Sequence, residues 1–111
     1  MENKLMEFLN SPIKRTWLVT KEISVYLRKG RHVGMNGAIR TYLDIANIEV
    51  RPAFQRKGIF KSFLSLCQRI QPYDGVFVEN VLTPILRAYL RRLALEDGRW
   101  FERGWDFLWE K

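Results

Sequence analysis

The stretch from Val50 to Lys61 is the part of this chain best suited to chemistry, because it combines several cations with a glycine and contains no acid. Arg56 and Lys57 precede Gly58, and the apolar spacing that follows predicts that a helix begins near this glycine. The first turn of a helix leaves N–H groups free and carries the positive end of the helix dipole, and a glycine lets the backbone approach a ligand closely. We therefore expect a loop that binds phosphate or pyrophosphate; the alternative is an ordinary solvated basic face.

Before this loop the sequence predicts one short helix and three strands. In chain order they are residues 2–9 for the helix and residues 16–20, 23–27 and 38–50 for the strands. Asn36-Gly37 is a strong hairpin signal, because both residues tolerate positive φ. The apolar phase of the long strand changes between Asp44 and Asn47, which indicates a β-bulge.

After the loop the spacing of apolar residues is typical first of a helix, then of a strand, and then of a second helix. The predicted elements are a helix over residues 58–70, a strand over 76–81, a helix over 83–95 and a closing hairpin over 99–102 and 105–109. Thr83-Pro84 supplies an N-cap and a first-turn proline, and Gly98 ends the helix. The expected fold class is α/β (α+β), with a mixed, mostly antiparallel sheet flanked by helices.

Composition predicts one folded domain spanning residues 1–111. Apolar residues make up 47% of the chain and aromatic residues 14%, which is enough to build a core. No apolar run is long enough to cross a membrane, and residues 1–7 carry acids where a secretory leader would need basic and then apolar residues. We expect a soluble cytoplasmic protein with no membrane partner.

The chain has a single cysteine, Cys67, and a single histidine, His32. One cysteine excludes an internal disulfide and argues against Cys-rich zinc sites and redox pairs. Cys67 lies on the apolar stripe of a predicted helix, so we interpret it as a core residue rather than as half of a catalytic Cys–His pair. No metal site is expected.

Lys and Arg number 19 against 12 Asp and Glu, and the resulting net charge of +7 favours an anionic partner. Residues 50–73 contain five bases and no acid, so the basic loop is the local anion-seeking stretch. One interpretation is a phosphorylated small molecule as ligand. The alternative function is a non-catalytic basic module that binds nucleic acid or an acidic protein, although no known nucleic-acid-binding signature is present.

The loop resembles the acetyl-CoA motif of the GNAT superfamily of N-acetyltransferases. In that family a strand ending in Val-x-Pro is followed by a short loop and by Gln/Arg-x-x-Gly-x-Gly/Ala at the start of a helix, and here residues 50–52 and 55–60 occupy those places. The strand 76–81, the helix with Tyr89 and the aromatic hairpin look like the family's later parts. The resemblance implies a GNAT-like sheet with a splayed strand pair that binds acetyl-CoA, and a transferase that acetylates an unknown amine.

The resemblance also implies roles for individual residues. Ile48 and Val50 would offer strand backbone groups to the pantetheine arm, and Tyr89 would protonate the CoA sulfur; Glu49 or a water would be the base. The residues expected to hold the pyrophosphate are Gln55, Arg56, Lys57, Gly58, Ile59, Phe60 and Lys61. Asn80 either bonds the cofactor or caps a turn; Tyr89 could equally be a core residue, and Glu49 a surface residue. Partners left open are a nucleic-acid-linked or acidic-protein acceptor and a second copy of the chain.

Overall fold

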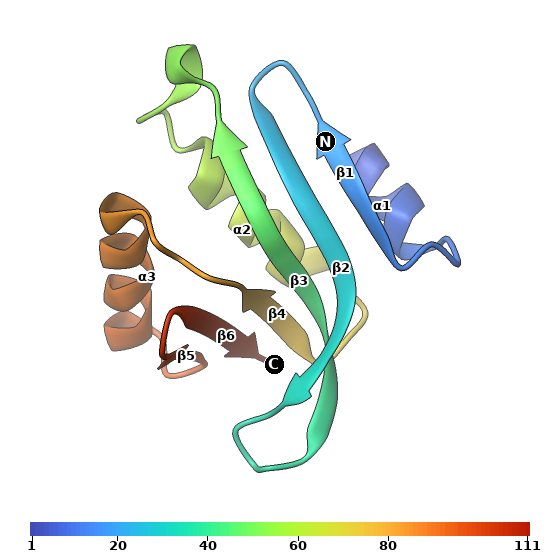
Figure 1. Cartoon of the computed structure of the whole chain (residues 1–111), viewed down its shortest axis with the longest axis vertical. Coiled ribbons are helices and arrows are strands. Elements are labelled where there is room, and N and C mark those ends of the chain that lie inside the picture. The colour runs from blue at the N-terminus through green and yellow to red at the C-terminus, as the bar shows by residue number, and fades with distance from the viewer.

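The structure, a computed structural model, describes all 111 residues and has the order of elements that the sequence predicts (Figure 1). The helices are α1 (Glu2–Leu9), α2 (Ile59–Ile70) and α3 (Pro84–Glu96), with a 3-10 turn, η1 (Pro52–Phe54), before α2. The strands are β1 (Arg15–Val19), β2 (Ile23–Val33), β3 (Ile39–Val50), β4 (Gly75–Val78), β5 (Trp100–Arg103) and β6 (Asp106–Glu110). None of these helices is both long and apolar enough to span a bilayer.

Two strand boundaries differ from the prediction. β2 continues to Val33 rather than ending near residue 27, because pairing with β3 holds its polar second half in the sheet. β4 ends at Val78 rather than at residue 81, because Asn80 takes the left-handed conformation, with φ of 55°, and turns the chain out of the sheet.

The six strands form one mixed sheet in the order β1-β2-β3-β4-β6-β5, so the fold is α+β as expected. β3 and β4 are the parallel neighbours, and every other pair is antiparallel. A parallel pair needs a crossover, and here the segment containing η1 and α2 supplies it. β3 is thereby placed directly before the basic loop and beside the strand that leads to α3.

The predicted bulge in β3 is confirmed. Leu27 pairs with Ile45 and Tyr26 pairs with Asn47, which leaves Ala46 without a partner on β2. One extra residue reverses the alternation of side chains along the strand. Ile45 and Ile48 therefore face the same side of the sheet, and Asn47 faces the other.

The main core lies between one face of the sheet and the three helices. It is one cluster of 19 buried residues, to which α1 contributes Leu5, α2 contributes Phe63 and Cys67, and α3 contributes Leu90. Cys67 is fully buried, as its place on the apolar stripe predicts, and burial raises the pKa of its thiol. The opposite face, called the second face below, carries a smaller cluster without helical residues: Tyr42, Phe77 and Leu108, with Phe101 against it.

A carboxylate on β5 fastens α3 to the sheet. Glu102 accepts hydrogen bonds from Arg87 Nη2 at 2.6 Å and from Arg91 Nε and Nη2 at 3.0 and 2.9 Å. Arg87 also lies over the ring of Trp105, with its guanidinium carbon 4.4 Å from the ring centroid. Because α3 carries Tyr89, this arrangement also sets where that tyrosine lies.

We predict that Glu102 gives the fold stability that acid removes. The hydrogen bond from Arg91 lowers the pKa of Glu102 below its usual value. A folded-state pKa below the unfolded one contributes stability above the usual carboxyl range and loses it as the pH falls through the lowered pKa. Glu102→Gln should therefore lower the melting temperature at pH about 7, and this difference from the parent should shrink as the pH is lowered below the usual carboxyl range, measured by circular dichroism.

Glu96→Gln is the control, because Glu96 is exposed on α3, the helix that Glu102 holds, and forms no ion pair. An equal effect of Glu102→Gln at neutral and at acid pH would show that packing, and not charge, is what Glu102 contributes.

Candidate functional site

The parallel strands β3 and β4 pair over only four residues and then diverge. Their register runs from Tyr42 opposite Gly75 to Ile45 opposite Val78, and a last hydrogen bond of 3.0 Å joins the Glu79 N–H to the Ile45 carbonyl. Beyond that point β3 continues for five residues, while the segment that follows β4 leaves the sheet toward α3 (Figure 1). We call this region, residues 46–50 on one side and 79–83 on the other, the strand divergence.

The backbone of β3 is oriented into the divergence at two of the predicted positions. The Arg51 N–H donates to the Glu22 carbonyl at 3.0 Å, so Arg51 and Glu49 direct their backbone groups toward β2. Ile48 and Val50 must then direct theirs to the opposite side, which β4 does not reach. The Val50 carbonyl is taken by Gln55 Nε2 at 3.0 Å, so this side chain closes the loop onto the strand.

The basic loop presents a series of free backbone donors. Arg56 and Gly58 are both left-handed, with φ of 62° and 73°, and Gly58 is the N-cap of α2. The cap has no side-chain hydrogen bond and the first turn contains no acid; the helix ladder begins with Ser62 N–H donating to the Gly58 carbonyl at 2.9 Å. Turns that contain left-handed residues form anion-binding nests of backbone N–H groups, and a helix start adds its own free N–H groups.

Three exposed cations surround these donors. Arg56, Lys57 and Lys61 form no ion pair with any acid of the chain, and Lys57 Nζ lies 5.7 Å from the centre of the Phe54 ring. Their charge is therefore available to an anion at the start of α2.

Tyr89 of α3 lies next to the first turn of α2. Its ring meets that of Phe60 edge to face, with centroids 5.9 Å apart and an interplanar angle of 85°. Phe60 is half-buried against the main core, so its ring is turned inward rather than toward the loop donors. Burial raises the pKa of Tyr89, opposed by the charge of Arg92, so the phenol stays protonated at neutral pH. The contact between Phe60 and Tyr89 therefore brings together two predicted site residues that lie far apart in the sequence.

The structure does not bring Glu49 and Asn80 to Tyr89. Glu49 is exposed, opposite Ser24 of β2, on the second face of the sheet, whereas Tyr89 packs on the helical face. The Asn80 N–H donates to Asp106 Oδ1 at 2.7 Å, and its side chain makes no hydrogen bond within the chain. The backbone of Asn80 thus has a structural role in the turn out of β4.

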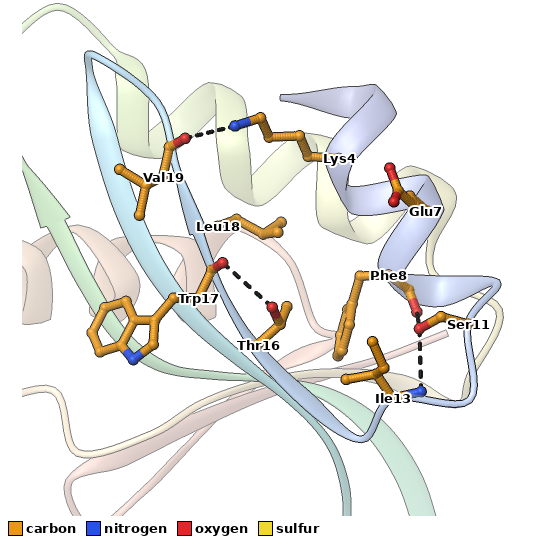
Figure 2. Close-up of a pocket in the computed structure, with 9 residues that line it drawn as sticks. All are labelled: Lys4, Glu7, Phe8, Ser11, Ile13, Thr16, Trp17, Leu18 and Val19. Atoms are coloured by element: carbon orange, nitrogen blue, oxygen red, sulfur yellow. Dashed lines mark hydrogen bonds between the residues drawn. The ribbon is translucent and has the colours of Figure 1, made fainter.

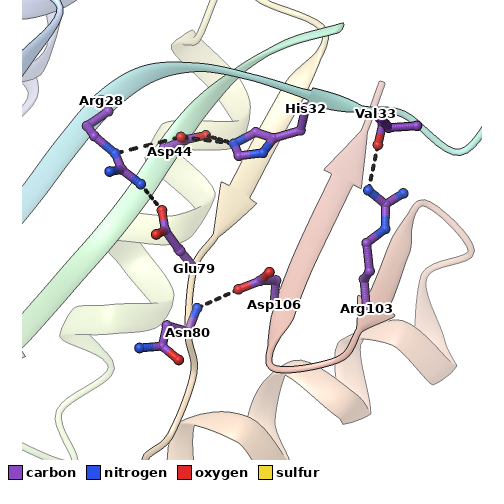
Figure 3. A network of polar contacts seen from close by, with 8 residues as sticks. All are labelled: Arg28, His32, Val33, Asp44, Glu79, Asn80, Arg103 and Asp106. Atoms are coloured by element: carbon purple, nitrogen blue, oxygen red, sulfur yellow. Dashed lines mark hydrogen bonds and ion pairs between the residues drawn. The ribbon is translucent and has the colours of Figure 1, made fainter. Parts of the chain in front are cut away.

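Sequence reasoning missed a polar network on the second face (Figure 3). His32 Nε2 lies 2.9 and 3.0 Å from the two carboxylate oxygens of Asp44, which is only 2% exposed, and the His32 ring stacks on Phe77 at 3.8 Å. Arg28 Nε is 3.9 Å from Asp44, and Arg28 also forms an ion pair with Glu79. Burial raises the pKa of Asp44, while the hydrogen bond from His32 and the charge of Arg28 oppose that rise.

The network places a further carboxylate at the divergence. Glu79 is the first residue after β4 and shares the second face with Glu49. The signal that could have revealed the network is the register of the β2–β3 hairpin around Asn36-Gly37. This register sets Arg28 opposite Asp44 and places His32 four pairs further along, on the same face of the sheet.

No group of three or more His, Cys, Asp or Glu side chains is arranged to hold a metal ion. Comparisons of the chain with models of known protein families, with curated proteins and with solved structures return no significant match. What defines the site is therefore its geometry: an α+β sheet with one diverging parallel strand pair, and a cationic helix start beside it.

Gly30 tests the buried part of the network. A Cβ added at this residue would overlap the Asp44 carboxyl group, so Gly30→Ala must displace the carboxylate from His32. We expect a loss of about 1–3 kcal/mol in the free energy of unfolding, measured by urea denaturation. Gly98→Ala is the control, because nothing lies within 4 Å of a Cβ there. Equal changes in the two variants would contradict a tightly packed Asp44.

Proposed function

We propose that this chain is an acetyl-CoA-dependent N-acetyltransferase of the GNAT type, acting on an amine acceptor. The observation that carries the proposal is the divergence of β3 from β4 beside the start of α2, where backbone donors and three cations are unpaired. A strand edge and an anion-binding helix start, placed end to end, suit a ligand that has an amide-bearing arm and a pyrophosphate.

The donor would lie along residues 48–61. The amides of a pantetheine arm would pair with the backbone of Ile48 and with the Val50 N–H, in the manner of an added strand. The pyrophosphate would accept hydrogen bonds from the loop N–H groups, with Arg56, Lys57 and Lys61 adding charge. Gln55, whose amide nitrogen is bonded to Val50, would shape the loop rather than contact the phosphate through that nitrogen.

In acetyl transfer the amine nitrogen bonds to the thioester carbon, the carbon–sulfur bond breaks, a base accepts the amine proton and an acid protonates the sulfur. We assign the acid role to Tyr89, because its phenol is protonated at neutral pH and its ring lies beside the first turn of α2. Glu49 suits the base, directly or through a water, because it is an exposed carboxylate on the second face. The amine would then approach from the second face while the sulfur departs on the helical face.

The first prediction from this proposal concerns CoA binding. Calorimetry should give an affinity in the micromolar range, about −8 kcal/mol at a Kd of 1 μM, and added salt should weaken it. Lys57→Glu reverses a charge at the pyrophosphate and should weaken binding at least about tenfold. Lys111→Glu, the same change beyond β6 at the opposite end of β3, should leave the CoA affinity unchanged. Pantetheine, which lacks the phosphates, should bind all three proteins equally.

Absence of binding up to millimolar CoA would remove the transferase proposal and leave the non-catalytic basic module as the better explanation of the charge. Equal CoA affinities of the Lys57→Glu variant and the parent would instead show that the phosphate lies elsewhere.

The second prediction separates chemistry from binding. Tyr89→Phe keeps the ring against Phe60 but removes the hydroxyl, so turnover should fall by roughly 10²-fold or more while CoA affinity stays the same. Tyr73→Phe is the control, because Tyr73 is also half-buried against the core. Release of free thiol reports turnover, and Cys67 is too buried to interfere.

A screen of polyamines, amino acids, peptides and amine-bearing nucleotides must first identify an acceptor. If Tyr89→Phe turns over that acceptor as fast as the parent, Tyr89 is not the acid, and water or another residue protonates the sulfur.

A further inference from the structure

β1 is an edge strand with backbone groups that no strand pairs. Lys29 N–H donates to the Lys14 carbonyl and Thr20 N–H to the Ile23 carbonyl, so the even-numbered residues of β1 face β2. Trp17 and Val19 therefore direct their N–H and carbonyl groups outward. Only side chains reach those carbonyls: Lys4 Nζ donates to Val19 at 2.8 Å and Thr16 Oγ1 to Trp17 at 3.4 Å.

A groove follows this free edge. The groove has a volume of about 260 Å³ and lies between α1 and β1, where α1 extends beyond the edge strand of the sheet (Figures 1 and 2). Phe8 of α1, Ile13 of the connection and Leu18 of β1 form its apolar lining, and Lys4 and Glu7 stand on the helix side. A chain laid beside β1 would thus have both a backbone partner and a pocket for a side chain.

The middle of this edge is apolar. Ile13, Trp17 and Val19 are 55%, 53% and 46% exposed, and Trp17 is held against Tyr26 at 5.1 Å between ring centroids. β1 contains no proline and no bulge, so the cations at its beginning, Lys14 and Arg15, are the feature that opposes pairing. An acidic partner would neutralise those cations, and the exposed apolar centre would then be free to pair.

Charge selects the partner. Lys14 and Arg15 stand at the beginning of β1, and Lys4 and Lys21 stand near its end. Glu7 in the groove and Glu22 beside Lys21 are the acids nearby, so cations outnumber acids along the edge. Antiparallel pairing of two copies about Trp17 would bring the Lys14 end of one copy to the Lys21 end of the other, between two chains of net charge +7. Like charges at both ends disfavour a second copy and favour an acidic partner.

We propose that the free edge of β1, with the α1–β1 groove, binds an extended peptide segment of another protein as a seventh strand. The segment has apolar residues at its centre, one of which fills the groove, and acidic residues at both ends. This binding function is separate from acetyl transfer and does not depend on it.

The test uses a capped synthetic peptide of about nine residues, with alternating Val and Thr around a central Phe and two Asp at each end. A second peptide has Lys in place of Asp. We expect saturable binding of the acidic peptide by fluorescence anisotropy, slower hydrogen exchange at the Trp17 and Val19 amides, and little binding of the Lys peptide. No binding up to millimolar peptide, or equal binding of both peptides, would overturn the proposal.

Variants place the binding on β1. Val19→Pro removes an outward N–H without breaking a bond to β2, and should weaken peptide binding at least about tenfold, whereas Val19→Thr should preserve it. Lys14→Glu should weaken peptide binding as well, and Lys111→Glu, beyond β6 on the far side of the sheet, should not. Retained affinity in a folded Val19→Pro variant would refute the edge as the site. If that variant fails to fold, the comparison of Lys14→Glu with Lys111→Glu decides.

Two further outcomes are distinguishable. Protection of the Trp17 amide that grows with protein concentration in the absence of peptide, together with a dimer in sedimentation, would identify a second copy as the occupant and overturn the acidic peptide. Lys57→Glu should leave peptide binding intact. Lys14→Glu should leave CoA binding intact, because Lys14 lies at the opposite end of β1 from the turn that contacts Arg51, so the two proposals fail independently.

Discussion

The extra residue at Ala46 reverses the alternation of β3 halfway along the strand, and the site follows from that reversal. Before the bulge Ile45 faces the helical core, and after it Ile48 does so. Without the bulge, Asn47 and Glu49 would face the apolar layer beneath α2, where an unpaired polar group costs a few kcal/mol. The bulge also begins where pairing with β4 ends, so the same residue turns the backbone of Ile48 toward the open side of the strand.

The two faces of the sheet are stabilised differently. The helical face is held by one apolar cluster to which all three helices contribute, whereas the second face has a small aromatic cluster and the network around Asp44. Burial of the Asp44 carboxylate is unfavourable, as its raised pKa shows, and His32 and Arg28 compensate for it in part. The network ties the long β2–β3 hairpin to β4 through Phe77 and Glu79.

Features set by residues close in sequence could be predicted, whereas features set by contacts between strands could not. The bulge, the start of α2 and the cationic loop depend on residues close in sequence, so spacing and residue type were sufficient. The extension of β2 through Arg28 and His32 was missed, because those residues have no strand preference and the pairing with β3 decides. The His32–Asp44 contact requires a hairpin register, and the contact of Phe60 with Tyr89 requires a packed fold.

The sign of charge differs between the two sides of the strand divergence. The unpaired cations Arg56, Lys57 and Lys61 stand at the start of α2, whereas Glu49 and Glu79 lie on the second face. Of these two carboxylates, Glu79 is neutralised by Arg28, but Glu49 forms no ion pair. On the second face of the divergence, Glu49 is therefore the carboxylate that no cation of the chain occupies, and it is the one open to an amine in the proposed reaction.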